Sequence, residues 1–222
     1  MAAYFSLFIE CLPTLLSGLE MTLFMAVVSL IFACIIGVIL GIFSISNIKW
    51  LEKIATFYIY VVRGIPLMVL GFFIFFGIGG GLNLQFSALT AAVISLTINA
   101  SAYMAEIFRG GIQAVDIGQV EAARSLGLSY IQAMMRVVLP QAIKIMIPAI
   151  LNQFITTIKD TSILSAISVR ELVMNGEIIV ARNFKPFEVY SYLAIMYLIV
   201  ITILSLITRR IERNMSYDSR GK

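Results

Sequence analysis

Two charged side chains stand beside long uncharged stretches, and they are the residues best suited to chemistry. Arg63 separates an uncharged run of nine residues from one of 42, and Asp160 follows another apolar run. A guanidinium can hold a carboxylate through two hydrogen bonds, and a carboxylate can accept from an ammonium group. Arg63 and Asp160 could therefore bind a small zwitterion, and Asn152, two helical turns before Asp160, would suit an uncharged polar group. The alternative is an empty structural ion pair of Asp160 with Arg63 or Lys159.

The residues around Arg63 predict a broken helix within a membrane. Arg63 lies about ten residues into a predicted span, roughly 15 Å deep at 1.5 Å per residue. A charge at that depth costs about 2.5–3.5 kcal/mol on insertion scales. Pro66 removes a backbone donor and Gly64 loosens the turn, and broken helices often build binding sites in membrane proteins. We expect a role in binding or gating, with pairing to an acid for packing alone as the alternative.

The composition predicts a protein embedded in a membrane. Of the 222 residues, 60% are hydrophobic and 13% are charged, whereas a soluble domain carries about 25% charged residues. Histidine is absent, which excludes His-ligated metal sites and a histidine general base. We predict no catalytic residue and no metal site.

Five apolar stretches predict an all-α integral membrane protein with five transmembrane helices. Residues 21–48 are uncharged and long enough for one tilted helix. The turn-rich segment around Gly79 divides the following apolar region into two spans, and two shorter stretches complete the set. The chain 1–222 is predicted to form a single transmembrane domain. The later spans lie near 50–76, 86–108, 145–158 (after Pro140) and 189–208.

The basic residues predict the orientation of these spans. Most lie in segments 49–53 and 109–139 and in the tail from Arg209, which includes Arg220 and Lys222. A five-span chain places these segments on one side, and cytoplasmic loops carry an excess of Lys and Arg. The N-terminus is therefore predicted outside and the C-terminus in the cytoplasm. Because the bases follow this pattern, the net charge of +4 does not indicate a nucleic-acid partner.

Three local features complete the membrane topology. Residues 4–17 are predicted to form a short interfacial helix before the first span. Segment 161–187 mixes apolar and charged residues at helical spacing and predicts a surface or re-entrant helix on the outer side. Gly37 and Gly41 have the spacing of glycines that bring helices close together.

The cytoplasmic loop 109–139 is predicted to be a compact knob of two short helices. Gly110-Gly111 predicts the end of the preceding helix. Asp116 can cap a first short helix, which Gly127 would end in a left-handed conformation. Ser129 can cap a second helix that runs to Val138, before Pro140 begins the fourth span.

The surface of this knob suits contact with a partner. Ala122 and Ala123 are small and permit close approach of another backbone. Glu121 and Arg124 are expected on the polar face, where they could form ion pairs across an interface. The alternative is a solvated helical loop with no partner.

The loop carries a pattern that resembles the EAA loop of ABC-transporter permeases. Glu121-Ala122-Ala123 is followed by three residues and Gly127, and after nine more by Val137-Val138-Leu139-Pro140. The resemblance covers nearly the whole chain and is nearest to glutamine-type members of the polar amino-acid permeases. Ile65 departs from the usual Thr, and Gly71-Phe72-Phe73 from a segment that often holds Gln. The further matching segments are Arg63–Pro66, Asn99–Gly110, Asn152-Gln153, Lys159–Ser162, Asn183-Phe184 and Arg209–Arg213.

This resemblance implies the type I ABC importer permease fold, in the cytoplasmic (inner) membrane of a bacterium. The implied activity is import of polar L-amino acids, with glutamine favoured and cystine, glutamate, aspartate or cationic amino acids as alternatives. The implied substrate-binding residues are Arg63, Asn152, Gln153, Asp160, Thr161 and Ser162, and those that couple to the ATPase are Glu121, Ala122, Ala123, Arg124 and Gly127.

The resemblance also implies partners. The chain has no GxxxxGK[ST] phosphate loop, so ATP and magnesium would be bound by separate ATP-binding cassette subunits. An extracytoplasmic binding protein would deliver the amino acid. Five helices cannot readily enclose a gated path, so a second permease chain is expected, as a homodimer or as a pair with a related chain. The rival classes are an ion-driven secondary transporter, which would usually show inverted repeats and more spans, and a non-transporting scaffold.

Overall fold

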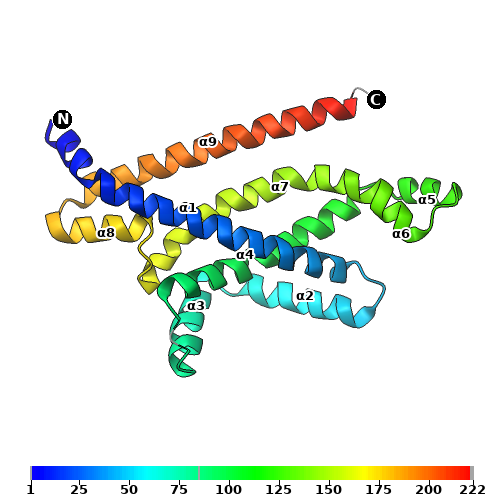
Figure 1. The fold of residues 1–222 in the computed structure, drawn as a ribbon, viewed down its shortest axis with the longest axis horizontal. Coiled ribbons are helices and arrows are strands. Elements are labelled where there is room, and N and C mark those ends of the chain that lie inside the picture. The colour runs from blue at the N-terminus through cyan, green and yellow to red at the C-terminus, as the bar shows by residue number, and fades with distance from the viewer. Residues whose placement is uncertain (1, 85, 221–222) are drawn as a thin grey trace.

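The computed structural model describes residues 2–84 and 86–220, with side chains for residues 4–84 and 86–213. Within these ranges all regular structure is helical (Figure 1). Lys222 and the side chain of Arg220, two of the predicted cytoplasmic bases, lie outside the described residues. The elements are α1 (Ala2–Ser44), α2 (Lys49–Gly64), α3 (Leu67–Phe72), the π-helix η1 (Phe73–Gly80), α4 (Ala88–Gln113), α5 (Ile117–Ser125), α6 (Tyr130–Ala133), the π-helix η2 (Met134–Val138), α7 (Leu139–Asp160), the 3₁₀ helix η3 (Thr161–Ile167), α8 (Leu172–Asn183) and α9 (Pro186–Arg220).

The predicted membrane protein is confirmed, and so is the predicted break in the span that carries Arg63. Among the described residues, four helical stretches are long and apolar enough to cross a bilayer: 4–44, 88–113, 130–167 and 186–213. The remaining predicted span, 50–76, which is the second along the chain, is not one straight helix. It consists of α2 and the α3–η1 segment, which meet at an angle of 100°.

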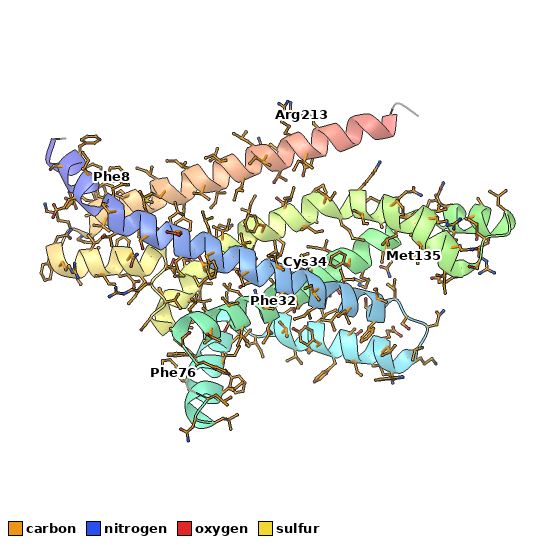
Figure 2. All side chains as sticks on the ribbon, viewed as in Figure 1. Phe8, Phe32, Cys34, Phe76, Met135 and Arg213 are labelled. Atoms are coloured by element: carbon orange, nitrogen blue, oxygen red, sulfur yellow. The ribbon has the colours of Figure 1, made fainter. Side chains whose placement is uncertain are left out.

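The break lies at Ile65 and Pro66, between α2 and α3. Both residues are extended, with ψ angles of 125° and 137°, as expected next to a proline. The arm formed by α3 and η1 points away from α2 (Figure 1). Its buried side packs Leu67, Leu70 and Ile74 into a core with α1, α4 and η3. Phe76, on the far side, is exposed (Figure 2).

The N-terminal segment corrects a sequence prediction. Residues 4–17 are not a separate interfacial helix, because α1 is continuous from Ala2 to Ser44. Leu7, Cys11 and Leu15 are buried against α8 and α9. The hydroxyl of Tyr192 donates to the carbonyl of Tyr4 at 2.7 Å. The N-terminal segment therefore packs on α8 and α9 within the protein, as part of one continuous helix.

Close packing of α1 against α4 through Gly37 and Gly41 is confirmed. A Cβ atom on Gly37 would lie 2.5 Å from the Cβ of Met104, and one on Gly41 would lie 2.8 Å from the Cβ of Phe108. Neither position has room for a side chain, so the two glycines allow the close approach of α1 and α4.

Two predicted helix boundaries are wrong. Gly110-Gly111 does not end α4, which continues to Gln113. Gly111 lies directly against the side chain of Met146, so it serves close packing of α4 on α7. The second knob helix does not stop at Val138 either, and helix continues through α6, η2 and α7. The π-turn, in which the Leu139 N–H donates to the carbonyl of Met134, leads into the turn that holds Pro140.

The segment predicted to hold a helix between the last two spans does so. After η3, Ser168 adopts a left-handed conformation (φ 66°) and turns the chain into α8. Phe184, also left-handed (φ 55°), ends α8 before α9 begins at Pro186. Helix α8 lies beside the N-terminal part of α1 (Figure 1), at the end opposite α5 and α6.

Gly37→Ala tests the α1–α4 contact. The added methyl group meets Met104 at a rigid point of its side chain, and overpacking of this kind costs about 1–3 kcal/mol. We expect the thermal midpoint in detergent to fall by about 2–4 °C for each kcal/mol. Gly110→Ala is the matched control, because nothing lies within 4 Å of a Cβ atom there. Equal midpoints for the two variants would show that the contact is not tight.

Candidate functional site

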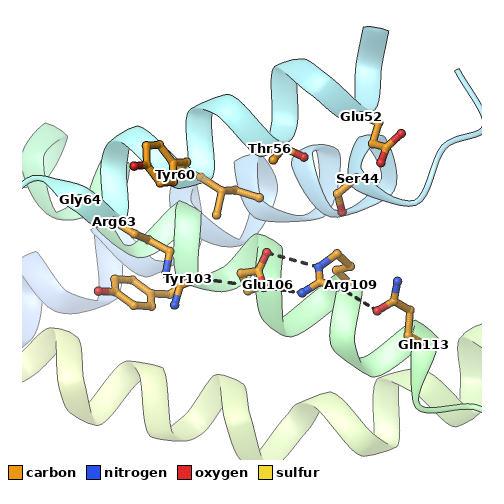
Figure 3. A pocket seen from close by; sticks show the side chains of 11 residues that line it. Ser44, Glu52, Thr56, Tyr60, Arg63, Gly64, Tyr103, Glu106, Arg109 and Gln113 are labelled. Atoms are coloured by element: carbon orange, nitrogen blue, oxygen red, sulfur yellow. Dashed lines mark hydrogen bonds and ion pairs between the residues drawn. The ribbon is translucent and has the colours of Figure 1, made fainter. Parts of the chain in front are cut away.

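A polar groove lies between α2 and α4. It encloses about 680 Å³ and is hereafter called the α2–α4 groove (Figure 3). Both helices belong to the apolar part of the chain, so a groove lined by charged and hydroxyl groups is unusual there. Its lining residues are Ser44, Glu52, Thr56, Ile59, Tyr60, Arg63, Gly64, Tyr103, Glu106, Arg109 and Gln113.

The spacing of residues on each helix builds the two walls. On α2, Glu52, Thr56, Tyr60 and Arg63 follow one another at intervals of four, four and three residues, which places them on one face. On α4, Tyr103, Glu106, Arg109 and Gln113 follow at intervals of three, three and four residues. Beside the polar face of α2, Ala55, Ile59 and Val62 are buried, and Ile59 also lines the groove. The sequence therefore turns one polar face of each helix into the groove.

Glu106 is the centre of a charge network in this groove. Arg109 donates to its carboxylate through Nη2 at 2.6 Å and through Nε at 3.3 Å. The Nη1 of Arg109 donates to Gln113 at 2.9 Å. Arg63 approaches the same carboxylate at 4.0 Å, and its guanidinium lies 5.3 Å from the ring centre of Tyr103. Glu106 and Arg109, three residues apart on α4, thus form an ion pair within one helix.

Arg63 is the cation that remains available for a ligand. Arg109 donates one hydrogen bond to each oxygen of Glu106, whereas Arg63 is only at the limit of ion-pair distance from it. Its side chain is 46% exposed. Stacking on Tyr103 fixes the guanidinium plane at the wall of the groove. Arg63 can therefore present a forked donor to an anionic group.

The alternative in which Asp160 forms an ion pair with Arg63 or Lys159 is wrong. The acid beside Arg63 within the chain is Glu106 and not Asp160, for which no ion pair is found among the described residues. Asp160 ends α7, which does not line the groove. The sequence suggested Asp160 because it is the one acid in the fourth span, whereas the fold places α4 next to α2.

The other predicted substrate residues lie on α7 and η3 and fall into two groups. Asn152 is exposed and Ser162 is half-buried. Gln153 and Thr161 are buried. The hydroxyl of Thr161 donates to the carbonyl of Ile158 at 2.7 Å, and Gln153 contacts Thr157 at 3.5 Å. Only Arg63 among the predicted substrate residues lies in the α2–α4 groove.

The knob has the predicted helix caps. The side chain of Asp116 accepts from the N–H of Gly118 at 2.7 Å. Gly127 is left-handed (φ 85°) and ends α5. Ser129 and Gln132 form a reciprocal capping box at the start of α6. These caps make α5 and α6 a defined pair of short helices beyond the ends of α4 and α7 (Figure 1).

The knob presents apolar side chains to its surroundings. Leu126 is 85% exposed, and Ile117, Ile131 and Met135 are also exposed (Figure 2). Among the predicted coupling residues, Glu121, Ala122 and Arg124 are exposed, while Ala123 is buried and holds α5 to the rest of the knob. Exposed apolar side chains of this size on α5, α6 and η2 indicate a surface that another protein covers.

Several groove residues were missed at the sequence level. Glu52, Thr56, Tyr60 and Tyr103 were not predicted as site residues, although they line the groove with Arg63. The available signal was their spacing of three and four residues in an apolar helix. This spacing was not used because each of these residues alone is common near a membrane surface. Only the packing of α2 on α4 brings the polar faces of the two helices together.

Comparisons with known proteins agree with this architecture. Residues 33–217 match the family described as binding-protein-dependent transport system inner membrane component. The chain is 40% identical over 214 residues to the probable amino-acid permease protein YxeN of Bacillus subtilis, with 96% of each chain covered. It is 40% identical to the glutamine transport system permease protein GlnP of Escherichia coli K12, covering 92% of this chain and 94% of that protein. The arginine transport system permease protein ArtQ of Bacillus subtilis is 36% identical, with 95% and 96% covered.

Solved structures show the same fold. An amino acid ABC transporter crystallised with histidines superimposes with a TM-score of 0.91 and 38% identity, covering 95% of this chain and 98% of that one. An inward-facing MetNI methionine ABC transporter gives a TM-score of 0.79 at 22% identity, covering 91% and 96%. The second similarity supports the arrangement of helices alone.

Glu106→Ala tests the charge network. Removal of the acid leaves two guanidinium groups facing one another, so we expect a lower thermal midpoint than for Arg109→Ala. The double variant should regain part of the loss, with a coupling energy of about 0.5–3 kcal/mol. Glu52→Ala is the control, since no ion pair is found for this acid on the opposite wall. Identical midpoints for Glu106→Ala and Glu52→Ala would contradict the network.

Proposed function

Because the chain belongs to the family of inner membrane components of binding-protein-dependent transport systems, we propose that it imports polar L-amino acids as the permease of an ATP-driven transporter. Glutamine is the favoured substrate, because several relatives are named glutamine permeases. Arginine remains a candidate, as a relative of similar identity is named an arginine permease. Cystine, glutamate and aspartate are further candidates within the proposed class.

The observation that carries this proposal is the α2–α4 groove. Its charged and hydroxyl groups lie on helices that the apolar sequence places in the bilayer. Lipid tails cannot hydrogen-bond to such groups, so a polar groove at membrane depth must face water or protein. A water-filled path for a polar solute explains the groove, whereas a scaffold protein would not need it.

A second permease chain covers the groove in our proposal. One chain contributes an open wall, since Arg63 and Tyr60 are exposed on it. Two such walls facing each other would enclose a path and remove polar groups from lipid. A homodimer needs no further gene product, and a related chain could take the same place. The groove supports this arrangement because its polar residues have no other cover among the described residues.

The charges of the groove suit an amino acid. Arg63 would hold the carboxylate through its forked donors. Asn152 and Asp160 would complete the site from α7, with Asp160 near the ammonium group and Asn152 near a side-chain amide. Gln153 and Thr161, whose side chains are buried, would hold the backbone of this segment. Ser162, half-buried, would lie at its edge.

The knob would transmit ATP hydrolysis from a separate ATPase. Exposed Leu126 and Ile131 provide an apolar contact, and Glu121 and Arg124 provide charges around it. The ATPase subunits would bind ATP and magnesium, and an extracytoplasmic protein would deliver the amino acid. In this assembly the chain is the permease and carries out no bond chemistry.

Gly127→Val tests the coupling role of the knob. Valine at a left-handed position costs about 1–2 kcal/mol, which would shift the end of α5. We expect ATP hydrolysis stimulated by the binding protein to fall about fivefold or more, while membrane levels stay unchanged. Gly110→Ala, on the helix leading to the knob, is the control. Full stimulation in Gly127→Val would remove the knob from the coupling path.

Arg63→Gln tests the carboxylate contact. A charge-assisted hydrogen bond is worth about 1.5–3 kcal/mol, so uptake at saturating glutamine should fall about tenfold or more. The glutamine concentration for half-maximal uptake should not change, because the binding protein sets it. Lys53→Gln, on the same helix, removes a charge at its other end and should transport normally. Normal uptake by Arg63→Gln would exclude Arg63 from the site.

A further inference from the structure

A buried carboxylate lies far from the α2–α4 groove, at the start of α8. Glu171 is 0% exposed. It belongs to none of the residues assigned above to transport, and it lies at the end of the molecule opposite the knob (Figure 1). A charged group in such a place requires an explanation, because acids are almost never fully buried without partners.

Each carboxylate oxygen of Glu171 has its own donor from a different element. Oε1 accepts from the N–H of Met174 at 2.7 Å and so caps α8. Oε2 accepts from the hydroxyl of Tyr197, on α9, at 3.3 Å. The carboxylate therefore connects the first turn of α8 to the middle of the last span.

Helix α1 closes the same junction from the other side. The N–H of Leu172 donates to the hydroxyl of Thr22 at 3.2 Å, and Asn175 donates to the carbonyl of Thr14 at 2.9 Å. A Cβ atom on Gly18 would lie 2.8 Å from the Cα of Leu172. The start of α8 is thus held against α1 by two hydrogen bonds and a backbone contact.

The fourth element at this junction is the start of η3. Helix η3 packs against both α1 and α8, and the hydroxyl of Tyr197 lies near those of Thr161 and Thr22. Thr161 is fully buried and directly follows Asp160 in the chain. Thr22, Thr161, Glu171 and Tyr197, hereafter the Glu171 cluster, therefore join α1, η3, α8 and α9 at one point.

Burying the polar groups of the Glu171 cluster costs free energy, although apolar side chains could fill the same space. Burial raises the pKa of the Glu171 carboxyl, against the opposing effect of its hydrogen bonds from the backbone and from Tyr197. Buried polar groups of this kind often contribute less to stability than apolar residues of similar volume would. What they provide is a fixed geometry, since each partner must stay in place for the carboxylate to be satisfied.

The exposed side of α8 offers a surface on the predicted outer face. Glu177 and Arg182 are exposed on the helix. Phe184, at its end, is 84% exposed, and Phe187 is 78% exposed. A protein that delivers substrate from outside would meet this surface first, while the buried side of the same helix ends in the Glu171 cluster.

We propose that Glu171 is a positioning residue that makes α8 and the Asp160–Ser162 segment move together, so that docking of the binding protein on α8 reaches the substrate segment. The inference rests on the proposed function. Docking would press on α8, and the carboxylate and Tyr197 would carry the displacement to Thr161. Loss of either group would leave both elements folded and joined through residues 168–171, but without the side-chain contact that couples their movement.

The test uses the reconstituted complex of the permease with its ATPase and binding protein. Glu171→Ala removes the carboxylate, and Tyr197→Phe removes only the hydroxyl group. We expect each to lower binding-protein-stimulated ATP hydrolysis about fivefold or more, with basal hydrolysis within about twofold of wild type. The double variant should be no worse than the more impaired single variant, because both act through one contact. Glu212→Ala is the control, because this acid lies at the far end of α9, away from both the cluster and the exposed side of α8.

Hydrogen exchange provides a readout that does not depend on transport. In both variants, residues 161–167 and 172–183 should exchange faster together, since a shared contact has been lost. Normal stimulation in Glu171→Ala and Tyr197→Phe would overturn the proposal. So would an equal loss of basal and stimulated hydrolysis, which marks a purely structural role. Failure of the wild-type complex to import any polar amino acid would instead contradict the proposed function, and hydrogen exchange would still test the cluster.

Discussion

The hydrocarbon core of a bilayer offers no hydrogen-bond partner. Because of this constraint, the polar side chains of the α2–α4 groove need water or protein beside them. On a soluble protein, a face with Glu52, Thr56, Tyr60 and Arg63 would be ordinary surface. On helices made for a membrane, it must be covered by water or protein. The pairing of Glu106 with Arg109 reduces the cost of one charge within the chain. Arg63 lies 4.0 Å from the same carboxylate and is partly exposed, and in the proposed function it binds the carboxylate of the solute.

The same helices connect the groove to the knob. Arg109 and Gln113 form the end of the groove and also the last turn of α4, only a few residues before α5 begins. Gly111 fixes this turn against Met146 of α7, which leads back from the other side of the knob. A displacement of α5 and α6 must therefore move the ends of α4 and α7. These contacts join the knob to the groove, as the proposed coupling requires.

Much of this architecture was predictable because membrane sequences encode it directly. Long uncharged stretches predicted the spans, and Asp116, Gly127 and Ser129 predicted the caps of the knob from local chemistry alone. The errors came from tertiary packing. Gly110-Gly111 predicted a helix end, but Gly111 instead packs against Met146 within α4. Residues 4–17 predicted an interfacial helix, but in the fold they are covered by α8 and α9.

The site was less predictable than the fold for the same reason. Arg63 was found because a charge in an apolar run is conspicuous by itself. Its acidic neighbour was not, since Glu106 looks like a local partner of Arg109, and only the packing of α2 on α4 brings it near Arg63. The orientation of the chain and the roles of Asn152 and Asp160 stay predictions.

The most direct test of the central claim is uptake of radiolabelled glutamine into proteoliposomes. The vesicles would contain this chain with its ATPase, and the binding protein would be added outside. We expect accumulation that requires ATP, is competed by unlabelled glutamine and is insensitive to leucine. Absence of ATP-dependent uptake for glutamine and every other polar amino acid would contradict the proposed import, as would uptake driven by an ion gradient without the ATPase.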